Sequence, residues 1–220
     1  MAYLLPFLAV FIGSSIAFFV QPKTAKGMKL LLAFSGAFLL GVLILEMLPQ
    51  VYQSQDHYAG IWILVGILFQ NLLEFFSKGA EHGHAHHGQT KQFPSVLLIS
   101  LCTHAFLEGL PLASQPTLLL AVSIHKIPIG LVVGLLLLQT KVPLYIKIIA
   151  LITFALMSPL GSYLGGYIDS PAMISQIEPF IVGILFHIST TILFESSEGH
   201  NFNLQKFLSI VLGIAVAALI

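Results

Sequence analysis

Two short stretches place metal-binding side chains inside apolar sequence. "HAFLEGLPLA", residues 104–113, contains His104 and Glu108, and "HKIPIG", residues 125–130, begins with His125. Residues four apart share one face of a helix, so His104 and Glu108 would point at the same object. Imidazole and carboxylate together form the ligand set that Zn²⁺ and neighbouring divalent transition metals prefer. These residues therefore predict a divalent-metal site within the apolar part of the chain.

The composition indicates the class of protein that must position these residues. The 220 residues are 57% hydrophobic and only 8% charged, whereas soluble domains carry about 25% charged residues. Nine lysines balance nine acidic residues, so the charge does not indicate a nucleic-acid partner. Cys102 is the only cysteine, which excludes an intrachain disulfide. We expect an all-α polytopic membrane protein, with residues 1–220 forming a single transmembrane domain.

Apolar segments long enough to cross a bilayer recur along the chain. A spanning helix needs about 20 mostly apolar residues, and the sequence predicts an eight-helix transmembrane bundle with spans at 3–20, 29–48, 59–77, 94–113, 117–139, 143–167, 174–194 and 204–220. The N-terminal segment lacks the features of a cleaved signal peptide, so we expect it to be retained as a span. The short link "ASQPT" predicts that spans 94–113 and 117–139 are antiparallel neighbours.

The lysines predict the orientation of the bundle. The loops between consecutive predicted spans are numbered 1 to 7. Eight of the nine lysines lie in or beside loops 1, 3, 5 and 7: Lys23, Lys26, Lys29, Lys78, Lys91, Lys141, Lys147 and Lys206. Cytoplasmic loops are enriched in Lys and Arg, so we expect these loops in the cytoplasm and both termini to be extracytoplasmic. The ninth, Lys126, lies within the fifth span.

Ionisable residues within spans cost about 2.5–3.5 kcal/mol each on insertion scales, and they usually mark a pathway or a site. An alternative stays open, in which these residues only hydrogen-bond one another between packed helices.

Glu46, at the outer end of the second span, either gathers cations at the mouth of a pathway or is a solvated helix end.

The seventh span carries a polar stripe directed towards the cytoplasm. His187, Thr191 and Glu195 are spaced four residues apart, so they share one helix face. We interpret the stripe as an exit path, with a helix-packing stripe as the alternative. Glu74, at the inner end of the third span, is expected to be merely interfacial.

The one long polar stretch is "KGAEHGHAHHGQTKQ", residues 78–92, which contains His82, His84, His86 and His87. Histidine-rich tracts are typical of metal binding, but this spacing in a flexible loop fixes no tetrahedral geometry. We therefore expect weak chelation on the cytoplasmic side, with a polar linker as the alternative.

Together these motifs resemble the Zrt/Irt-like (ZIP) family of metal transporters. "HAFLEGLPLA" is similar to the fourth-helix signature and "HKIPIGLVVG" to the fifth-helix signature, while "EMLP" (46–49) and "HISTTILFE" (187–195) extend the likeness across the chain. The resemblance implies transport of a divalent metal, typically Zn²⁺, into the cytoplasm. It also implies that His104, Glu108 and His125 hold the ion between helices four and five.

The chain departs from the family pattern at three positions. The fifth-helix glutamate is replaced by Ile129, and the Asn and Asp that many bacterial members carry after the two histidines are Ala105 and Lys126. We therefore expect a single-metal site. Lys126 could stand where a second cation would and act as a counter-ion to Glu108, or it could pair elsewhere.

Other functions compete with metal transport as interpretations of these residues. An intramembrane metalloprotease would need His-Glu-x-x-His on one helix, and the sequence contains no such string, so we do not expect an enzyme. A membrane metal sensor or scaffold stays an alternative, as does transport of Fe²⁺, Mn²⁺ or Cd²⁺. No resident cofactor is expected, because the metal is the transported substrate. The expected partners are divalent metal ions and the lipid bilayer of the plasma membrane, with a homodimer left open.

Overall fold

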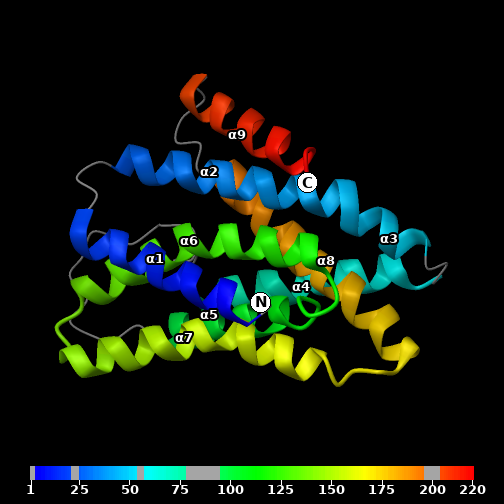
Figure 1. Cartoon of the computed structure of the whole chain (residues 1–220), viewed down its shortest axis with the longest axis horizontal. Coiled ribbons are helices and arrows are strands. Elements are labelled where there is room, and N and C mark those ends of the chain that lie inside the picture. Colours follow the sequence, from blue (N-terminus) through cyan, green and yellow to red (C-terminus); the bar gives the residue numbers. More distant parts are fainter. Residues whose placement is uncertain (1–2, 21–24, 54–56, 78–94, 196–203) are drawn as a thin grey trace.

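The structure is a computed structural model that describes residues 3–20, 25–53, 57–77, 95–195 and 204–220. Its elements are α1 (Leu4–Val20), α2 (Ala25–Val42), the π-helical η1 (Leu43–Met47), α3 (Leu48–Gln53), α4 (Ala59–Ser77), α5 (Ser95–Gly109), α6 (Pro116–Gln139), α7 (Leu144–Gly165), α8 (Pro171–Glu195) and α9 (Leu204–Ala217). The described ranges contain helices and turns but no strand (Figure 1). The predicted all-α class is confirmed.

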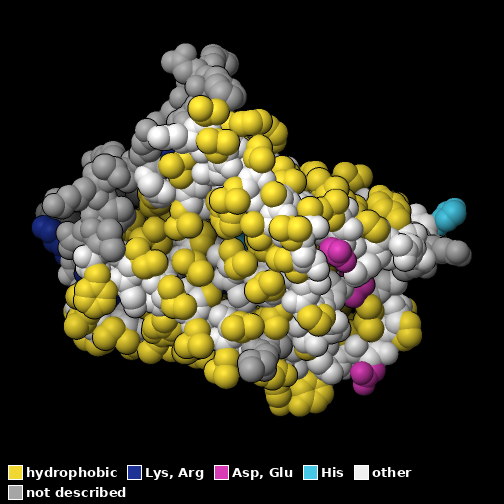
Figure 2. All heavy atoms as spheres, turned by 45° about the horizontal axis from the view of Figure 1, so that its top comes forward, with side chains coloured by type: hydrophobic (Ala, Val, Ile, Leu, Met, Phe, Trp, Pro, Cys, Tyr) yellow, Lys and Arg dark blue, Asp and Glu magenta, His cyan; other side chains and the backbone are white. Residues whose placement is uncertain are grey.

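The outside of the helical assembly is apolar. Phe19, Leu68 and Phe75 are each more than two thirds exposed, and hydrophobic side chains cover much of the face in Figure 2. Five of the described helical segments are long and apolar enough to cross a membrane: Gly27–Gln53, Ala59–Phe76, Pro116–Gln139, Leu144–Gly165 and Pro171–Phe194. The three other apolar helices, α1, α5 and α9, are shorter. An exterior of this kind suits a lipid environment.

The helices pack as two groups. In the first group, α1 lies along α6 and α7, and α5 lies along α7. In the second, α2 lies against α8 and α9, and α4 lies against α8. Contacts between the groups run mainly from α2 to α6 and from α4 to α5, so segments far apart in the sequence lie side by side (Figure 1).

Helices α5 and α6 are not among the closely packed pairs, although the short link between them led us to predict close neighbours. The reason lies in small residues on both α5 and α7, which allow these two helices to pack closely. A Cβ atom on Gly109 would collide with the backbone oxygen of Ser158, and one on Gly161 would collide with that of Phe106. Small residues allow such close approach of two helices in a membrane. Long polar side chains instead bridge the space between α5 and α6.

Two predicted span boundaries also need correction. The helix predicted over 94–113 ends at Gly109. The next residue, Leu110, precedes Pro111, and a residue before a proline is disfavoured in the helical conformation. The helix predicted over 29–48 continues to Gln53 through η1. Glu46 therefore lies within a π-helical segment and not at the helix end. Such segments occur frequently at functional sites.

Candidate metal site

Three side chains from α5 and α6 converge in the interior. His104, Glu108 and His125 each offer one ligand atom, and these atoms all lie within 4.8 Å of one another. The exposed fractions of the three residues are 4%, 0% and 1%. The Nε2 atom of His104 lies 3.1 Å from Oε2 of Glu108, as expected for residues four apart on one helix.

The polar atoms of this cluster are incompletely hydrogen-bonded. Among the described residues, neither ring nitrogen of His104 nor Oε2 of Glu108 has a partner in hydrogen-bonding geometry. Buried polar groups are nearly always paired, so an exception calls for an explanation such as a bound ion. Two imidazoles and a carboxylate are the chemistry that Zn²⁺ and similar ions require. The residues therefore have the ligand chemistry of a divalent-metal site.

Lys126 lies in the same cluster, with 1% of its surface exposed. Its Nζ atom forms an ion pair with Oε1 of Glu108 and lies 4.8 Å from the centre of the Phe154 ring on α7. A cation at this distance from an aromatic face is attracted to the ring. The ammonium group is thus held between an anion and an aromatic ring.

The two other departures from the family pattern lie in apolar surroundings. Ala105 and Ile129 belong to one buried hydrophobic cluster that also contains Leu101 and Phe154. The number of metal ions that the site binds stays a prediction.

Two serines contact the candidate ligands from other helices. The Oγ atom of Ser35 on α2 lies 3.1 Å from Nδ1 of His125. The Ser158 hydroxyl on α7 donates to the backbone oxygen of Ala105 at 2.9 Å and lies 3.3 Å from Oε1 of Glu108. Close packing of α5 on α7 brings Ser158 to this position. Helices outside the α5–α6 pair therefore support both a histidine and the carboxylate.

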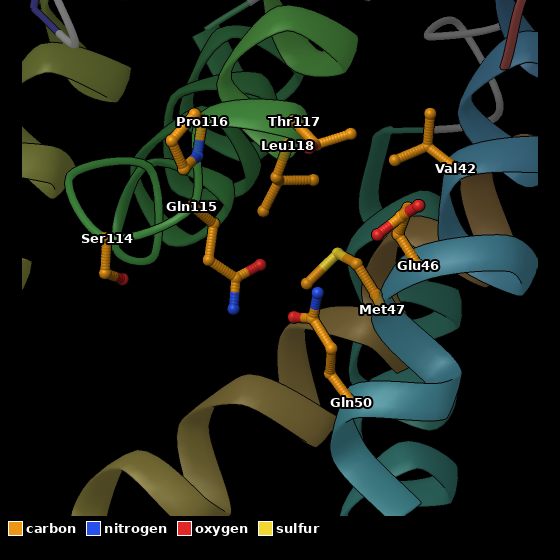
Figure 3. Close-up of a pocket in the computed structure, with 9 residues that line it drawn as sticks. All are labelled: Val42, Glu46, Met47, Gln50, Ser114, Gln115, Pro116, Thr117 and Leu118. Carbon is orange, nitrogen blue, oxygen red and sulfur yellow. The ribbon is translucent and has the colours of Figure 1, made fainter. Parts of the chain in front are cut away.

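Glu46 lines a separate pocket of about 110 Å³ (Figure 3). In this view Glu46 and Gln50 project from one wall, and Gln115 projects from the facing segment at the start of α6. Nε2 of Gln115 also donates to Oε1 of Glu178 on α8 at 2.9 Å. Leu118, which lines the pocket, precedes His125 by seven residues on α6, which corresponds to about 10 Å along a helix. The pocket is therefore distinct from the cluster around Glu108.

The polar stripe on α8 has a partner on α4. Nε2 of His187 lies 2.7 Å from Oε2 of Glu74, and both side chains are less than one fifth exposed. The Thr191 hydroxyl lies 3.5 Å from the same nitrogen. Glu74 was expected to be merely interfacial, and the structure adds a hydrogen-bonding contact between its carboxylate and His187 on the neighbouring helix. Glu195 ends α8, and its side chain is not described.

The predicted loop ligands lie outside the described residues: His82, His84, His86 and His87. Their role in metal binding stays a prediction.

Sequence reasoning missed Ser35, Ser158 and Glu74. The serines carry no signal in the sequence, because single hydroxyl residues are common in spanning helices. Their partners lie 90 and 50 residues away. For Glu74, a carboxylate within an otherwise apolar helix was a usable signal.

Comparison with known proteins adds an independent finding. A family model described as "ZIP Zinc transporter" matches residues 81–220, which is more than half of the chain and includes α5 to α9. No curated protein matches the chain.

Proposed function

The chain belongs to the ZIP zinc transporter family, and on this premise we propose that it carries Zn²⁺ into the cytoplasm through the site of His104, Glu108 and His125. Membership of the family makes the chain a multi-pass membrane protein and a transporter of divalent metal ions. Zn²⁺ as the ion, inward transport, location in the plasma membrane and the identity of the site are the proposal.

One observation carries the site assignment. Two imidazoles and a carboxylate meet at full burial, within 4.8 Å of one another. Three protein ligands leave a fourth position of a tetrahedral ion open to water or to an exchanging group, unlike the closed cages of structural zinc sites. An open position suits a transporter because the ion must leave as well as bind. All three ligands come from one chain, so this site does not require a second copy.

The distribution of charge supports an orientation with both termini outside. Lys29, Lys141 and Lys206 lie near the ends of α2, α6 and α9 that would face the cytoplasm. In Figure 2, lysine side chains lie at one end of the molecule, and acidic side chains lie towards the opposite end. The positive-inside rule then places the lysine-bearing end in the cytoplasm.

A path through the molecule can be drawn from the remaining polar residues. The pocket at Glu46 would receive the ion on the extracytoplasmic side, where a carboxylate and amide oxygens can replace part of its hydration shell. His187, Glu74 and Thr191 would receive it on the cytoplasmic side of the central cluster. Ion-binding side chains within membrane helices commonly mark such pathways.

Lys126 supports transport of one ion at a time. Its ammonium group carries a positive charge beside Glu108, where a family pattern with aspartate would favour a second metal. In this account Lys126 is the counter-ion of Glu108 and moves aside when the metal binds. Like charges at close range in a poorly solvated interior repel strongly. A metal ion and the ammonium group of Lys126 therefore cannot both bind the Glu108 carboxylate closely at the same time.

One uptake experiment tests both transport and the assignment of the site. The chain would be reconstituted into proteoliposomes, and uptake of ⁶⁵Zn²⁺ would be compared for wild type, His104→Ala, Glu108→Gln and His125→Ala. His57→Ala is the matched control, because His57 is an exposed histidine outside the helices. We expect uptake by wild type and control and its loss in the three site variants.

Competition by Fe²⁺, Mn²⁺ and Cd²⁺ identifies the preferred ion, because affinity order alone does not. Saturable Zn²⁺ binding by the wild-type chain without any uptake would favour a sensor or scaffold. Wild-type uptake in all three site variants would contradict the site assignment.

A further inference from the structure

Ser35 reaches the candidate metal site from the second group of helices. It lies on α2 with 1% of its surface exposed, and its Oγ atom is 3.1 Å from Nδ1 of His125 on α6. His125 is buried to the same degree. The contact therefore crosses between the two helix groups in a region closed to bulk water.

The position of Ser35 is fixed by the packing of α2. A Cβ atom on the adjacent Gly36 would lie 2.9 Å from Cγ2 of Ile192 on α8, and 3.2 Å from the backbone oxygen of Ser189. Phe38 and Leu39, one turn further along, are fully buried. The helix has little freedom to rotate or withdraw, so the hydroxyl group of Ser35 is presented to His125 by a rigid element.

The chemistry of imidazole gives this contact a consequence. A neutral histidine carries one N–H donor and one nitrogen lone pair, and only the lone pair can bind a metal. When Nδ1–H donates to the oxygen of Ser35, the lone pair is on Nε2. Metal-binding histidines almost always donate their other N–H to an oxygen in this manner, and loss of that partner typically costs about 10- to 100-fold in metal affinity.

We propose that Ser35 is a positioning residue for the transported ion, which accepts a hydrogen bond from Nδ1 of His125 and thereby directs Nε2 towards Glu108 and His104. The proposal rests on the proposed function and adds a residue to it that supplies no ligand atom. The ion recognised is a divalent transition metal that takes imidazole nitrogen.

Two other buried serines, Ser123 and Ser189, hydrogen-bond within their own helices. The hydroxyl of Ser123 donates to the backbone oxygen of Leu119 within α6, and that of Ser189 donates to Phe186 within α8. Bonds of this kind within one helix are the usual arrangement for serine in a helix interior. Ser123 lies two residues from His125 and is also buried, so it is a close control for Ser35.

The test uses the full chain in detergent, with the four loop histidines replaced by serine in every variant so that they do not bind the added metal. Histidine is labelled with ¹⁵N, and the His125 signal is assigned by its loss in His125→Gln. Without metal, we expect the Nδ1–H tautomer in wild type and in Ser123→Ala, and a shift towards the Nε2–H tautomer in Ser35→Ala. Titration with Zn²⁺ should give a dissociation constant about 10- to 100-fold higher for Ser35→Ala, with recovery in Ser35→Thr.

Two results would overturn the proposal: a Ser35→Ala variant with the wild-type tautomer, or one with the wild-type dissociation constant for Zn²⁺. If Ser35→Thr fails to fold at this buried position, the comparison of Ser35→Ala with Ser123→Ala decides. A wild-type chain that binds no Zn²⁺ would overturn the proposed function separately, since the tautomer is measured without metal and still tests the contact between Ser35 and His125.

Discussion

The carboxylate of Glu108 on α5 and the ammonium group of Lys126 on α6 form an ion pair, with exposed fractions of 0% and 1%. This pair joins two helices that are not closely packed against each other. Glu108 is also one of the three candidate ligands. The metal ion and Lys126 therefore compete for one carboxylate. A substitution of Lys126 should for this reason change both the number of bound metal ions and their affinity.

Replacement of Lys126 should change metal binding in two ways. Lys126→Gln removes a cation beside the site, so the Zn²⁺ dissociation constant should fall by about tenfold or more. Lys126→Asp adds a carboxylate and should raise the number of bound ions from one towards two. Calorimetric titration gives both quantities, and Lys141→Gln, at an exposed lysine outside the helices, is the control. Equal affinity and equal stoichiometry in wild type and both variants would make Lys126 a packing residue.

The histidine–glutamate pair between α8 and α4 should affect transport more than binding at the central site. Glu74→Gln weakens and His187→Ala removes the contact of 2.7 Å between the two side chains, and both leave His104, Glu108 and His125 unchanged. We expect several-fold slower ⁶⁵Zn²⁺ uptake with an unchanged affinity of the central site. Ser175→Ala, at a partly exposed position on α8, provides a control. Wild-type uptake in both variants would show that the pair only fastens two helices together.

The sequence was sufficient for the features that depend on local spacing. His104 and Glu108 lie four residues apart, and helix geometry alone brings their side chains together. The early end of α5 was missed, although Pro111 gave a usable signal because a proline disfavours helix at the preceding residue. The separation of α5 from α6 was not readable, because it depends on the docking of Gly109 against α7. Ser35 was missed for the same reason, since its partner lies 90 residues away.

The close packing of α5 on α7 should be sensitive to a single methyl group. In Gly109→Ala the new Cβ atom would collide with the backbone of Ser158, and overpacking of this kind costs about 1–3 kcal/mol. We expect a lower midpoint of thermal unfolding in detergent, together with weaker Zn²⁺ binding because Ser158 contacts Glu108. Gly27→Ala is the matched control, since a Cβ atom there meets nothing within 4 Å. A midpoint for Gly109→Ala equal to that of the control would contradict the packing described for α5 and α7.

The histidine-rich loop should be dispensable for the transport step itself. Replacement of His82, His84, His86 and His87 by serine removes four imidazoles from a polar stretch between two spans. The maximal rate of ⁶⁵Zn²⁺ uptake in proteoliposomes should stay close to that of wild type, while the total Zn²⁺ bound per chain should fall. Complete loss of uptake would mean that the loop belongs to the ion pathway.

The central claim is that His104, Glu108 and His125 hold one Zn²⁺ ion together, and X-ray absorption at the zinc edge tests it most directly. The sample would be the loop-substituted chain loaded with one equivalent of Zn²⁺ and compared with its His104→Ala variant. We expect two imidazoles and oxygen ligands at about 2.0–2.2 Å in the first, and one imidazole fewer in the second. A shell of oxygen ligands alone, or a spectrum unchanged by His104→Ala, would contradict the account.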